Sequence, residues 1–279
     1  MKPYNELTRQ GQLRRLRQLT LEALKAYDIQ VKRVNFFTRE TNTMFKVRSD
    51  AGERFMFRIY SDEETTLKEN QAEIYWLQAI KRDTNIKITE PVARRDGRYI
   101  TIASLPGVPG KKRCILFKWV PGRQLEKALN PKNYAKLGEA MARLHNHAGP
   151  LGPIPLEIQP KKWDKVFYYP GESAIYHTAA YQHLFSREVI TVLEAVIEKA
   201  NKVFDDLFSN PDALILIHGD LHYWNVHVHR GELYLLDFED IMLGYPLQDI
   251  AITLYYGQDR DGYPQLRSAF QRGYTRLRP

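Results

Sequence analysis

The sequence lacks the features that would place the protein outside the cell or in a membrane. Its 279 residues include one cysteine, Cys114, which excludes an internal disulfide and a metal site with several cysteine ligands. The longest purely aliphatic run, residues 213–217, is far shorter than the ~20 residues that a membrane-spanning helix needs. Residues 1–19 are rich in charge and contain no apolar core of a secretory signal. We therefore expect a cytoplasmic protein with no membrane segment.

Basic residues outnumber acidic ones, 41 Lys and Arg against 33 Asp and Glu, but the two signs are unevenly distributed. Residues 81–118 contain ten basic and three acidic residues, whereas residues 212–249 contain seven acidic residues and one basic residue, Arg230. Carboxylates concentrated in a basic chain indicate a divalent-cation site, with a solvated acidic loop as the alternative. The basic remainder suits an anionic ligand such as a nucleotide phosphate. Because no nucleic-acid motif accompanies it, we do not expect a nucleic acid as partner.

The first part of the chain has the pattern of a small sheet flanked by helical segments. Apolar residues at helical spacing predict helices over 13–27 and 65–80. Strand-like segments separated by turns are expected at 31–37, 43–47, 54–60, 93–95, 99–103 and 114–119. Glycines at the turns 49–52 and 96–97 can adopt positive φ angles, which favours hairpins at both places.

After Pro121-Gly122 the pattern becomes mainly helical. A helix is expected over 133–147, and Ser186 can cap a longer one. The apolar stripe of this second helix, with steps that alternate between four and three residues, is Val189, Leu193, Val196, Ala200, Val203 and Leu207. Two short strands are expected at 226–229 and 233–238. The sequence thus predicts an α+β protein with a small lobe over 1–119 and a larger helical lobe over 120–279.

One stretch of the larger lobe contains the side chains that phosphoryl transfer requires. His218, Asp220 and Asn225 have the spacing His-x-Asp-x-x-x-x-Asn, and a predicted hairpin then leads to Asp237. An aspartate on a tight loop can accept the proton of an attacking hydroxyl, and an asparagine five residues later can turn its amide oxygen toward Mg²⁺. The hairpin returns the chain so that a second aspartate meets the same metal. For His-x-Asp alone a capped turn is the alternative, but the complete set is far more constrained.

The residues around this motif resemble the aminoglycoside phosphotransferase and choline kinase family. As in that family, glycine follows His218 and glutamate follows Asp237-Phe238. Further segments that resemble family motifs, in the same order along the chain, are 117–122, 138–145 and 244–251. The resemblance implies a two-lobed protein-kinase-like fold, in which a small antiparallel sheet lobe with one main helix sits on a larger helical lobe.

The resemblance also implies roles for the residues of the site. Asp220 would be the catalytic base, Asn225 and Asp237 would hold Mg²⁺, and Asp249 would anchor the catalytic loop. Arg58 would bind phosphate at a position where many relatives have lysine, paired with Glu69 or Glu73. The family pattern favours Glu73 as the partner. A surface ion pair is the alternative for this arginine and its carboxylate.

For the nucleotide, ATP or GTP, the resemblance implies contacts in the small lobe and the hinge. The loop 38–42, which includes Asn42, would cover the phosphates. This loop has no glycine, so its backbone is less suited to cradle phosphate than a glycine-rich loop. The backbone from Phe117 to Trp119 would contact adenine.

Residues 218–229 include four of the eight histidines, so a transition-metal site is an alternative use of this region. No set of histidines and carboxylates has the spacing of a zinc site. Within the resemblance, His218 would be a scaffold that hydrogen-bonds the backbone near Asp237. We expect His222 to brace the loop.

We expect a Mg²⁺-dependent phosphotransferase that moves the γ-phosphate of ATP to a hydroxyl of a small molecule. The resemblance implies an acceptor site in the aromatic-rich segments 163–170 and 176–185, with packing in the core as the alternative. The alternatives are a protein Ser/Thr kinase of the bacterial stress-response type and a non-catalytic kinase-like binding protein. Relatives commonly continue beyond the segment matching residues 273–279, so we expect a short member or a shortened chain, and shortening would expose an apolar face in the helical lobe.

Overall fold

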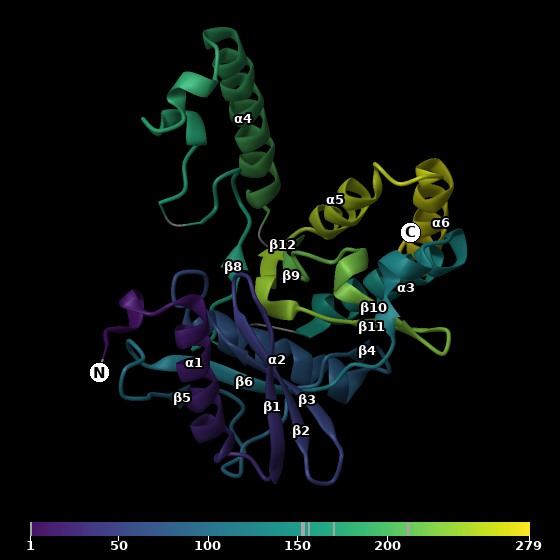
Figure 1. Ribbon diagram of the computed structural model, residues 1–279. Coiled ribbons are helices and arrows are strands. Elements are labelled where there is room, and N and C mark those ends of the chain that lie inside the picture. The colour runs from purple at the N-terminus through teal and green to yellow at the C-terminus, as the bar shows by residue number, and fades with distance from the viewer. Residues whose placement is uncertain (1, 152–153, 156, 170, 211–212) are drawn as a thin grey trace.

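The structure is a computed structural model that describes residues 2–151, 154–155, 157–169, 171–210 and 213–279. It has a sheet lobe below and a helical lobe above, as Figure 1 shows. The sheet lobe contains five antiparallel strands in the order β1-β2-β3-β6-β5. Their bounds are β1 (Val31–Arg39), β2 (Thr43–Ser49), β3 (Arg54–Ile59), β5 (Thr101–Ala103) and β6 (Lys112–Lys118).

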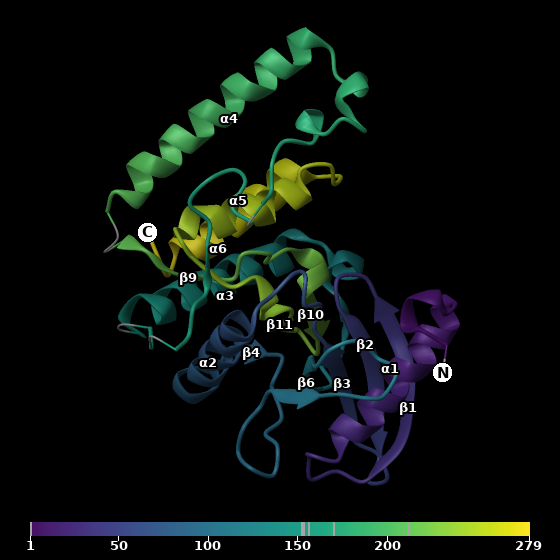
Figure 2. The same ribbon diagram turned by 90° about the vertical axis from the view of Figure 1, so that its left-hand side faces the viewer.

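One helix covers each face of this sheet. Alternate residues of a strand point to opposite faces, so Phe55 and Phe57 on β3 pack against α1 (Arg9–Leu24). Met56 and Arg58 alternate with these phenylalanines and line the cleft instead. The other helix, α2 (Leu67–Asp83), packs between the sheet and the larger lobe (Figure 2). The alternation therefore brings the arginine of β3 to the lobe interface.

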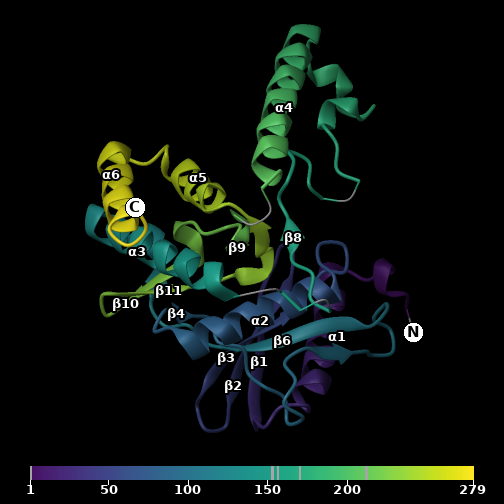
Figure 3. The ribbon, with the colours of Figure 1, turned by 180° about the vertical axis from the view of Figure 1, so that it is seen from behind.

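The larger lobe is built on α3 and α6. These helices, α3 (Pro131–Ala148) and α6 (Tyr263–Thr275), lie side by side in Figure 3. Gly138 and Gly273 allow the close approach, because a Cβ at Gly138 would overlap the carbonyl of Phe270 and one at Gly273 would overlap that of Ala135. A third helix of this lobe, α5 (Pro246–Gly257), precedes α6 in the chain.

Two small sheets hold the loop between β9 and β10. The first has the order β4-β11-β10-β7 and the second β8-β12-β9. Their bounds are β4 (Lys87–Ile88), β7 (Arg123–Gln124), β8 (Lys161–Lys162), β9 (Ile215–Ile217), β10 (Val226–His229), β11 (Glu232–Leu235) and β12 (Met242–Gly244). Since β4 precedes the predicted lobe boundary at 119/120 and pairs with β11 beyond it, one sheet draws strands from both sides of that boundary.

Most predicted elements are present within a few residues of their expected bounds, with two differences. The segment 93–95 is not a strand, because it enters a turn in which the Arg94 N–H donates to the Arg98 carbonyl at 2.7 Å. The strand expected over 233–238 ends at Leu235. It ends there because Asp237 has left-handed backbone geometry, with φ of 61°, and the chain then enters a 3₁₀ helix at Phe238–Asp240.

The predicted long helix is present as α4 (Arg187–Phe208), and the Ser186 side chain caps it by accepting from the Val189 N–H. Its apolar stripe, however, does not enter a core, and no residue of α4 is buried. In Figures 1 and 2, α4 extends away from the other helices of the larger lobe. No described helix combines the length and the apolar character required to cross a membrane.

Candidate active site

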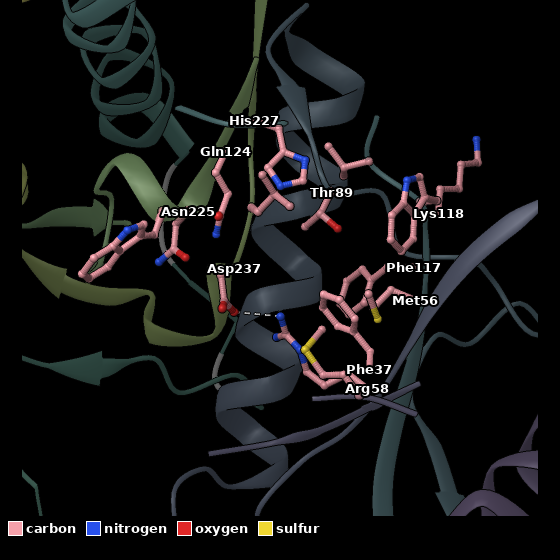
Figure 4. Close-up of a pocket in the computed structure, with 15 residues that line it drawn as sticks. Phe37, Met56, Arg58, Thr89, Phe117, Lys118, Gln124, Asn225, His227 and Asp237 are labelled. Atoms are coloured by element: carbon pink, nitrogen blue, oxygen red, sulfur yellow. Dashed lines mark hydrogen bonds and ion pairs between the residues drawn. The ribbon is translucent and has the colours of Figure 1, made fainter. Parts of the chain in front are cut away.

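A cavity of about 200 Å³ lies between the two lobes. Its walls are mainly apolar, and one end is polar, where Arg58, Asn225 and Asp237 approach one another (Figure 4). The remaining lining residues are Phe37, Met44, Met56, Thr89, Phe117, Lys118, Trp119, Val120, Gln124, Trp224, His227 and Leu236. An apolar slot that ends in charged groups suits a flat ring joined to an anionic tail.

Arg58 connects the two lobes at the polar end of this cavity. Its guanidinium binds Glu73 of α2 through Nη1–Oε1 at 3.1 Å and Asp237 through Nη2–Oδ1 at 2.7 Å. Glu239 lies 3.5 Å from Nη1. Burial alone would lower the pKa of Arg58, but the carboxylates of Asp237 and Glu73 raise it well above its ordinary value. The arginine is therefore charged and binds carboxylates from both lobes.

The structure identifies Glu73, not Glu69, as the partner of Arg58. Glu69 instead completes a capping box with Thr66 at the start of α2. The second oxygen of Glu73 accepts a hydrogen bond from the Tyr60 hydroxyl. The Arg58–Glu73 pair is buried, so the alternative of a surface ion pair is wrong.

Glu239 is a further carboxylate of this cluster. Burial raises the pKa of Glu239 to about 8, with a further contribution from Asp237, while Arg58 opposes the change. The Asn42 amide donates to the Glu239 carboxylate and accepts from the Ser61 N–H at 3.0 Å. Asn42 thus ties the loop between β1 and β2 to the larger lobe, and it is not among the residues that line the cavity.

Asp220 and Asn225 are held together on the loop between β9 and β10. The Asn225 Nδ2 donates to both the backbone carbonyl and the carboxylate Oδ2 of Asp220, each at 2.9 Å. Because both of these oxygens of Asp220 need a donor, the amide nitrogen of Asn225 is assigned to the side that faces Asp220. The amide oxygen Oδ1 of Asn225 then remains available to bind a metal ion. The spacing of five residues between Asp220 and Asn225 therefore lets Asn225 hold the Asp220 carboxylate and orient its own amide oxygen at the same time.

Asp249 anchors the first residues of this loop. Its carboxylate accepts from the backbone N–H groups of His218 and Gly219, both at 2.8 Å. The Asp249 carboxylate also lies 3.0 Å from His145 Nε2 on α3. Gly219 has a φ of 80°, and a Cβ there would overlap the Asp240 carbonyl, so this position requires glycine.

His218 has the scaffold geometry that was expected. Its Nε2 lies 3.0 Å from the carbonyl of Leu236, the residue before Asp237, and its Nδ1 accepts from the Asp220 N–H at 3.3 Å. The ring also packs against Phe238 at 4.5 Å between centroids. Among the described residues, no group of three or more His, Cys, Asp and Glu side chains is arranged to hold a metal ion.

The sequence matches the profile of the phosphotransferase enzyme family over residues 36–279. The chain belongs to this family. A relative in Synechocystis sp., an uncharacterized protein, is 26% identical over 270 residues, which cover 94% of this chain and 70% of the relative.

Solved structures of small-molecule kinases share the fold. The amicoumacin kinase hAmiN in complex with AMP-PNP, Ca²⁺ and Ami has a TM-score of 0.72 at 19% identity, covering 97% of this chain and 80% of that one. A microcompartment-associated aminopropanol kinase has a TM-score of 0.68 at 19% identity, covering 94% and 81%. The choline kinase of Cryptosporidium parvum has a TM-score of 0.57 at 16% identity, covering 88% and 73%. The predicted family and the two-lobed kinase-like fold are confirmed.

The predicted site residues of this family member lie together in the structure. Those that line the cavity are Arg58, Phe117, Trp119, Asn225 and Asp237, and those in direct contact with the lining residues or their partners are Asp220, Glu73 and Asn42. The sequence reasoning missed Met56, Tyr60 and Glu239. Alternation along β3 could have identified the first two, because residues 56, 58 and 60 share one face of a strand. Glu239 was part of the motif that resembles the family, but its contacts depend on the turn after Asp237 and were not expected.

Proposed function

We propose that the protein transfers the γ-phosphoryl group of ATP to a hydroxyl of a small molecule in a Mg²⁺-dependent reaction. One observation carries the proposal: Arg58, Asn225 and Asp237 meet at the polar end of an apolar cavity. Next to them, Oδ2 of Asp220 lies 2.9 Å from Nδ2 of Asn225. Phosphoryl transfer requires mainly positioning and charge neutralisation, which these four side chains can supply.

The apolar part of the cavity is suited to the purine ring. Met56, Phe117 and Leu236 line it, and they come from both lobes. In the hinge, the N–H groups of Lys118 and Trp119 already donate to the carbonyls of Glu90 and Arg54 at 2.8 and 3.0 Å. We therefore assign the hinge donor for the base to the N–H of Val120, which also lies at the cavity. Either ATP or GTP would fit this assignment.

The donor set fits a hard divalent cation. Asn225 offers its amide oxygen, and Asp237, whose side chain is 40% exposed, offers the carboxylate oxygen that Arg58 does not bind. Phosphate oxygens and water would complete the coordination. When bound, Mg²⁺ would neutralise charge on the phosphates.

The remaining steps belong to side chains of the chain itself. Arg58 would bind phosphate oxygens while Glu73 holds its guanidinium in place. Asp220 would accept the proton of the acceptor hydroxyl as that oxygen forms its bond to phosphorus and the bond to the ADP oxygen breaks. Arg58 would stabilise the charge that develops on the leaving ADP.

We assign the acceptor side to the segment 161–169, which contacts Asp240 in the turn after Asp237. The Tyr169 hydroxyl donates to Asp240 at 3.4 Å, and Lys161 binds the same carboxylate at 2.9 Å. The aromatic rings of Trp163 and Tyr168 pack beside them, 5.8 Å apart. Family members of known structure include an aminopropanol kinase and a spectinomycin phosphotransferase, which supports a small alcohol over a protein as acceptor.

The test combines turnover with nucleotide binding. Asp220→Ala should reduce ADP formation by about 10² to 10⁴-fold, while calorimetry shows nearly unchanged binding of a non-hydrolysable ATP analogue. Asp237→Ala should weaken Mg²⁺-dependent binding of that analogue. Asp259→Ala, at an exposed position outside the site, is the control and should match the natural protein in both assays.

The acceptors to screen are amino alcohols, amino acids, sugars, aminoglycosides and protein substrates. Retained turnover in Asp220→Ala would contradict the assignment of the base. A natural protein that binds nucleotide but phosphorylates nothing, and forms no ADP, would favour the non-catalytic binding protein.

A further inference from the structure

The imidazole of His222 lies next to Asp220, and the family resemblance assigns it no role beyond bracing the loop. Its Nε2 is 3.3 Å from Asp220 Oδ1, and its Nδ1 accepts from the Trp224 N–H at 3.2 Å. Asn225 donates to the other carboxylate oxygen, Oδ2, at 2.9 Å. The carboxylate of Asp220 is thus contacted on one oxygen by His222 and on the other by Asn225.

The contact with Trp224 determines the tautomer of the ring. A backbone N–H can only donate, so Nδ1 of His222 must be an acceptor and carries no proton. In a neutral ring the proton then resides on Nε2, the atom that faces Asp220 Oδ1. His222 therefore presents an N–H to Asp220 Oδ1 across a distance of 3.3 Å.

The ring has little freedom to turn away from this position. The His222 side chain is 7% exposed, and its ring packs against Tyr256 at 4.2 Å and Trp224 at 5.3 Å between centroids. The neighbouring residue, Leu221, is also held, because Thr253 of α5 donates to its carbonyl. Packing and backbone contacts thus fix the donor before any substrate binds.

We propose that His222 is a positioning residue that holds the carboxylate of Asp220 in the orientation needed to receive the acceptor proton. The inference rests on the proposed function, in which Asp220 is the base. Rotation about the Cβ–Cγ bond of Asp220 would break the hydrogen bond from Asn225 and the polar contact between His222 Nε2 and Oδ1. Loss of the His222 donor should therefore lower kcat and leave KM for ATP unchanged, because the nucleotide contacts lie on other residues.

A purely structural role is the alternative, since His222 is also the N-cap of the 3₁₀ helix at Tyr223–Asn225. The two roles use different ring atoms, and two substitutions separate them. His222→Asn keeps an acceptor near the Nδ1 position for the Trp224 N–H but is too short to donate to Asp220. His222→Gln places an amide nitrogen near the Nε2 position and lacks the cap acceptor.

The kinetic experiment compares these two variants in ADP formation under saturating acceptor or, without one, in ATP hydrolysis. We expect His222→Asn to lose about tenfold to a hundredfold in kcat at unchanged KM for ATP. His222→Gln should be at least about tenfold faster than His222→Asn, even though its Tm is the lower of the two. The reverse order of kcat, with Asn the faster variant, would overturn the proposal in favour of a cap.

A second measurement does not depend on catalysis. Long-range ¹H–¹⁵N correlation spectra of the full chain at alkaline pH should show His222 with its proton on Nε2, and Asp220→Ala should shift that signal. A proton on Nδ1 would overturn the proposal. If the natural protein neither bound nucleotide nor turned it over, the proposed function would fail. The tautomer of His222 would then be the remaining test of whether its Nε2–H faces Asp220.

Discussion

The helices α3 and α4 are both strongly amphipathic, and the structure uses them in opposite ways. The apolar face of α3 packs into the core with Leu137, Met141 and Leu144 fully buried. On α4, Val196 and Val203 remain 59% and 51% exposed, although the stripe has equally regular spacing. A periodic stripe thus predicts a helix, but which side chains become buried depends on what the rest of the chain places beside it.

The helices α3 and α4 also differ in how they are connected to the candidate active site. The loop that bears Asp220 is tied through Asp249 to His145 of α3, and His145 in turn contacts Tyr274 of α6 at 2.8 Å. By contrast, α4 contacts mainly the preceding segment, for example through Asn201, which accepts from the Val166 N–H at 2.9 Å. The proposed chemistry therefore rests on the α3 region, and substitutions there should cost more than substitutions on α4.

The largest effect is expected from Asp249→Ala. The change leaves two backbone N–H groups, of which that of His218 is buried, and the buried His145 ring without their acceptor, and breaking a buried pair costs about 3 to 5 kcal/mol. Urea denaturation should show this loss in the free energy of unfolding. Asp205→Ala on α4 is the matched control, expected within about 0.5 kcal/mol of the natural protein. Equal losses in both variants would contradict the comparison.

Asp249 also predicts a pH dependence. Burial alone would raise its pKa, but the hydrogen bond and charge interaction with His145, together with His218, hold the pKa below its ordinary value. The Asp249 carboxylate therefore contributes fully to the free energy of unfolding above pH ~4, the ordinary pKa of an aspartate. This contribution is lost as the pH falls through the lowered pKa of Asp249. Asp249→Asn should show a smaller decline in stability between about pH 5 and pH 2 than the natural protein.

Leu137→Ala should cost about 2 to 5 kcal/mol of unfolding free energy, because Leu137 is fully buried and the change leaves a cavity between α3 and its neighbours. Leu184→Ala, in the segment before α4 where the side chain is 66% exposed, is the control with the same chemistry. Thermal and urea unfolding followed by circular dichroism measure both. A loss below about 1 kcal/mol for Leu137→Ala would show that α3 is no more a core helix than α4.

The caps of the two helices give a smaller contrast. Asn130 and Ser186 each accept from the N–H three residues later, at 2.9 and 3.3 Å. Asn130→Ala should lower the free energy of unfolding by about 1 kcal/mol, because α3 unfolds together with the core. Ser186→Ala should instead leave global unfolding unchanged and speed amide hydrogen exchange in the first turns of α4. Equal shifts of global unfolding would mean that both helices unfold with the core.

The smallest effect is expected from Val196→Ala. The side chain is 59% exposed, so little apolar surface leaves the interior, and alanine favours a helix more than valine does. The free energy of unfolding should change by no more than about 0.5 kcal/mol. A loss above about 1 kcal/mol would show that the α4 stripe is covered in solution.

Local patterns in the sequence predicted much of the fold and the spacing of Asp220, Asn225 and Asp237, whereas the family resemblance implied the other site residues. The hairpin between the predicted strands 226–229 and 233–238 and the motif from His218 to Asp237 each depend on near neighbours, which the sequence displays directly. The partner of Arg58 was narrowed to two glutamates one turn apart and was decided only by packing. The contacts of Tyr60, Glu239 and Asn42 join three distant segments and were not predicted.

The sequence by itself determined most of the helices and strands and the spacing of Asp220, Asn225 and Asp237, because periodicity, caps and motif spacing act over a few residues. Only the tertiary structure decided that Glu73 pairs with Arg58, that Asn225 and His222 each contact one oxygen of Asp220, and that α4 keeps its stripe exposed. These outcomes depend on which surfaces meet after folding. Contacts between residues far apart in the chain leave no local pattern from which to infer them.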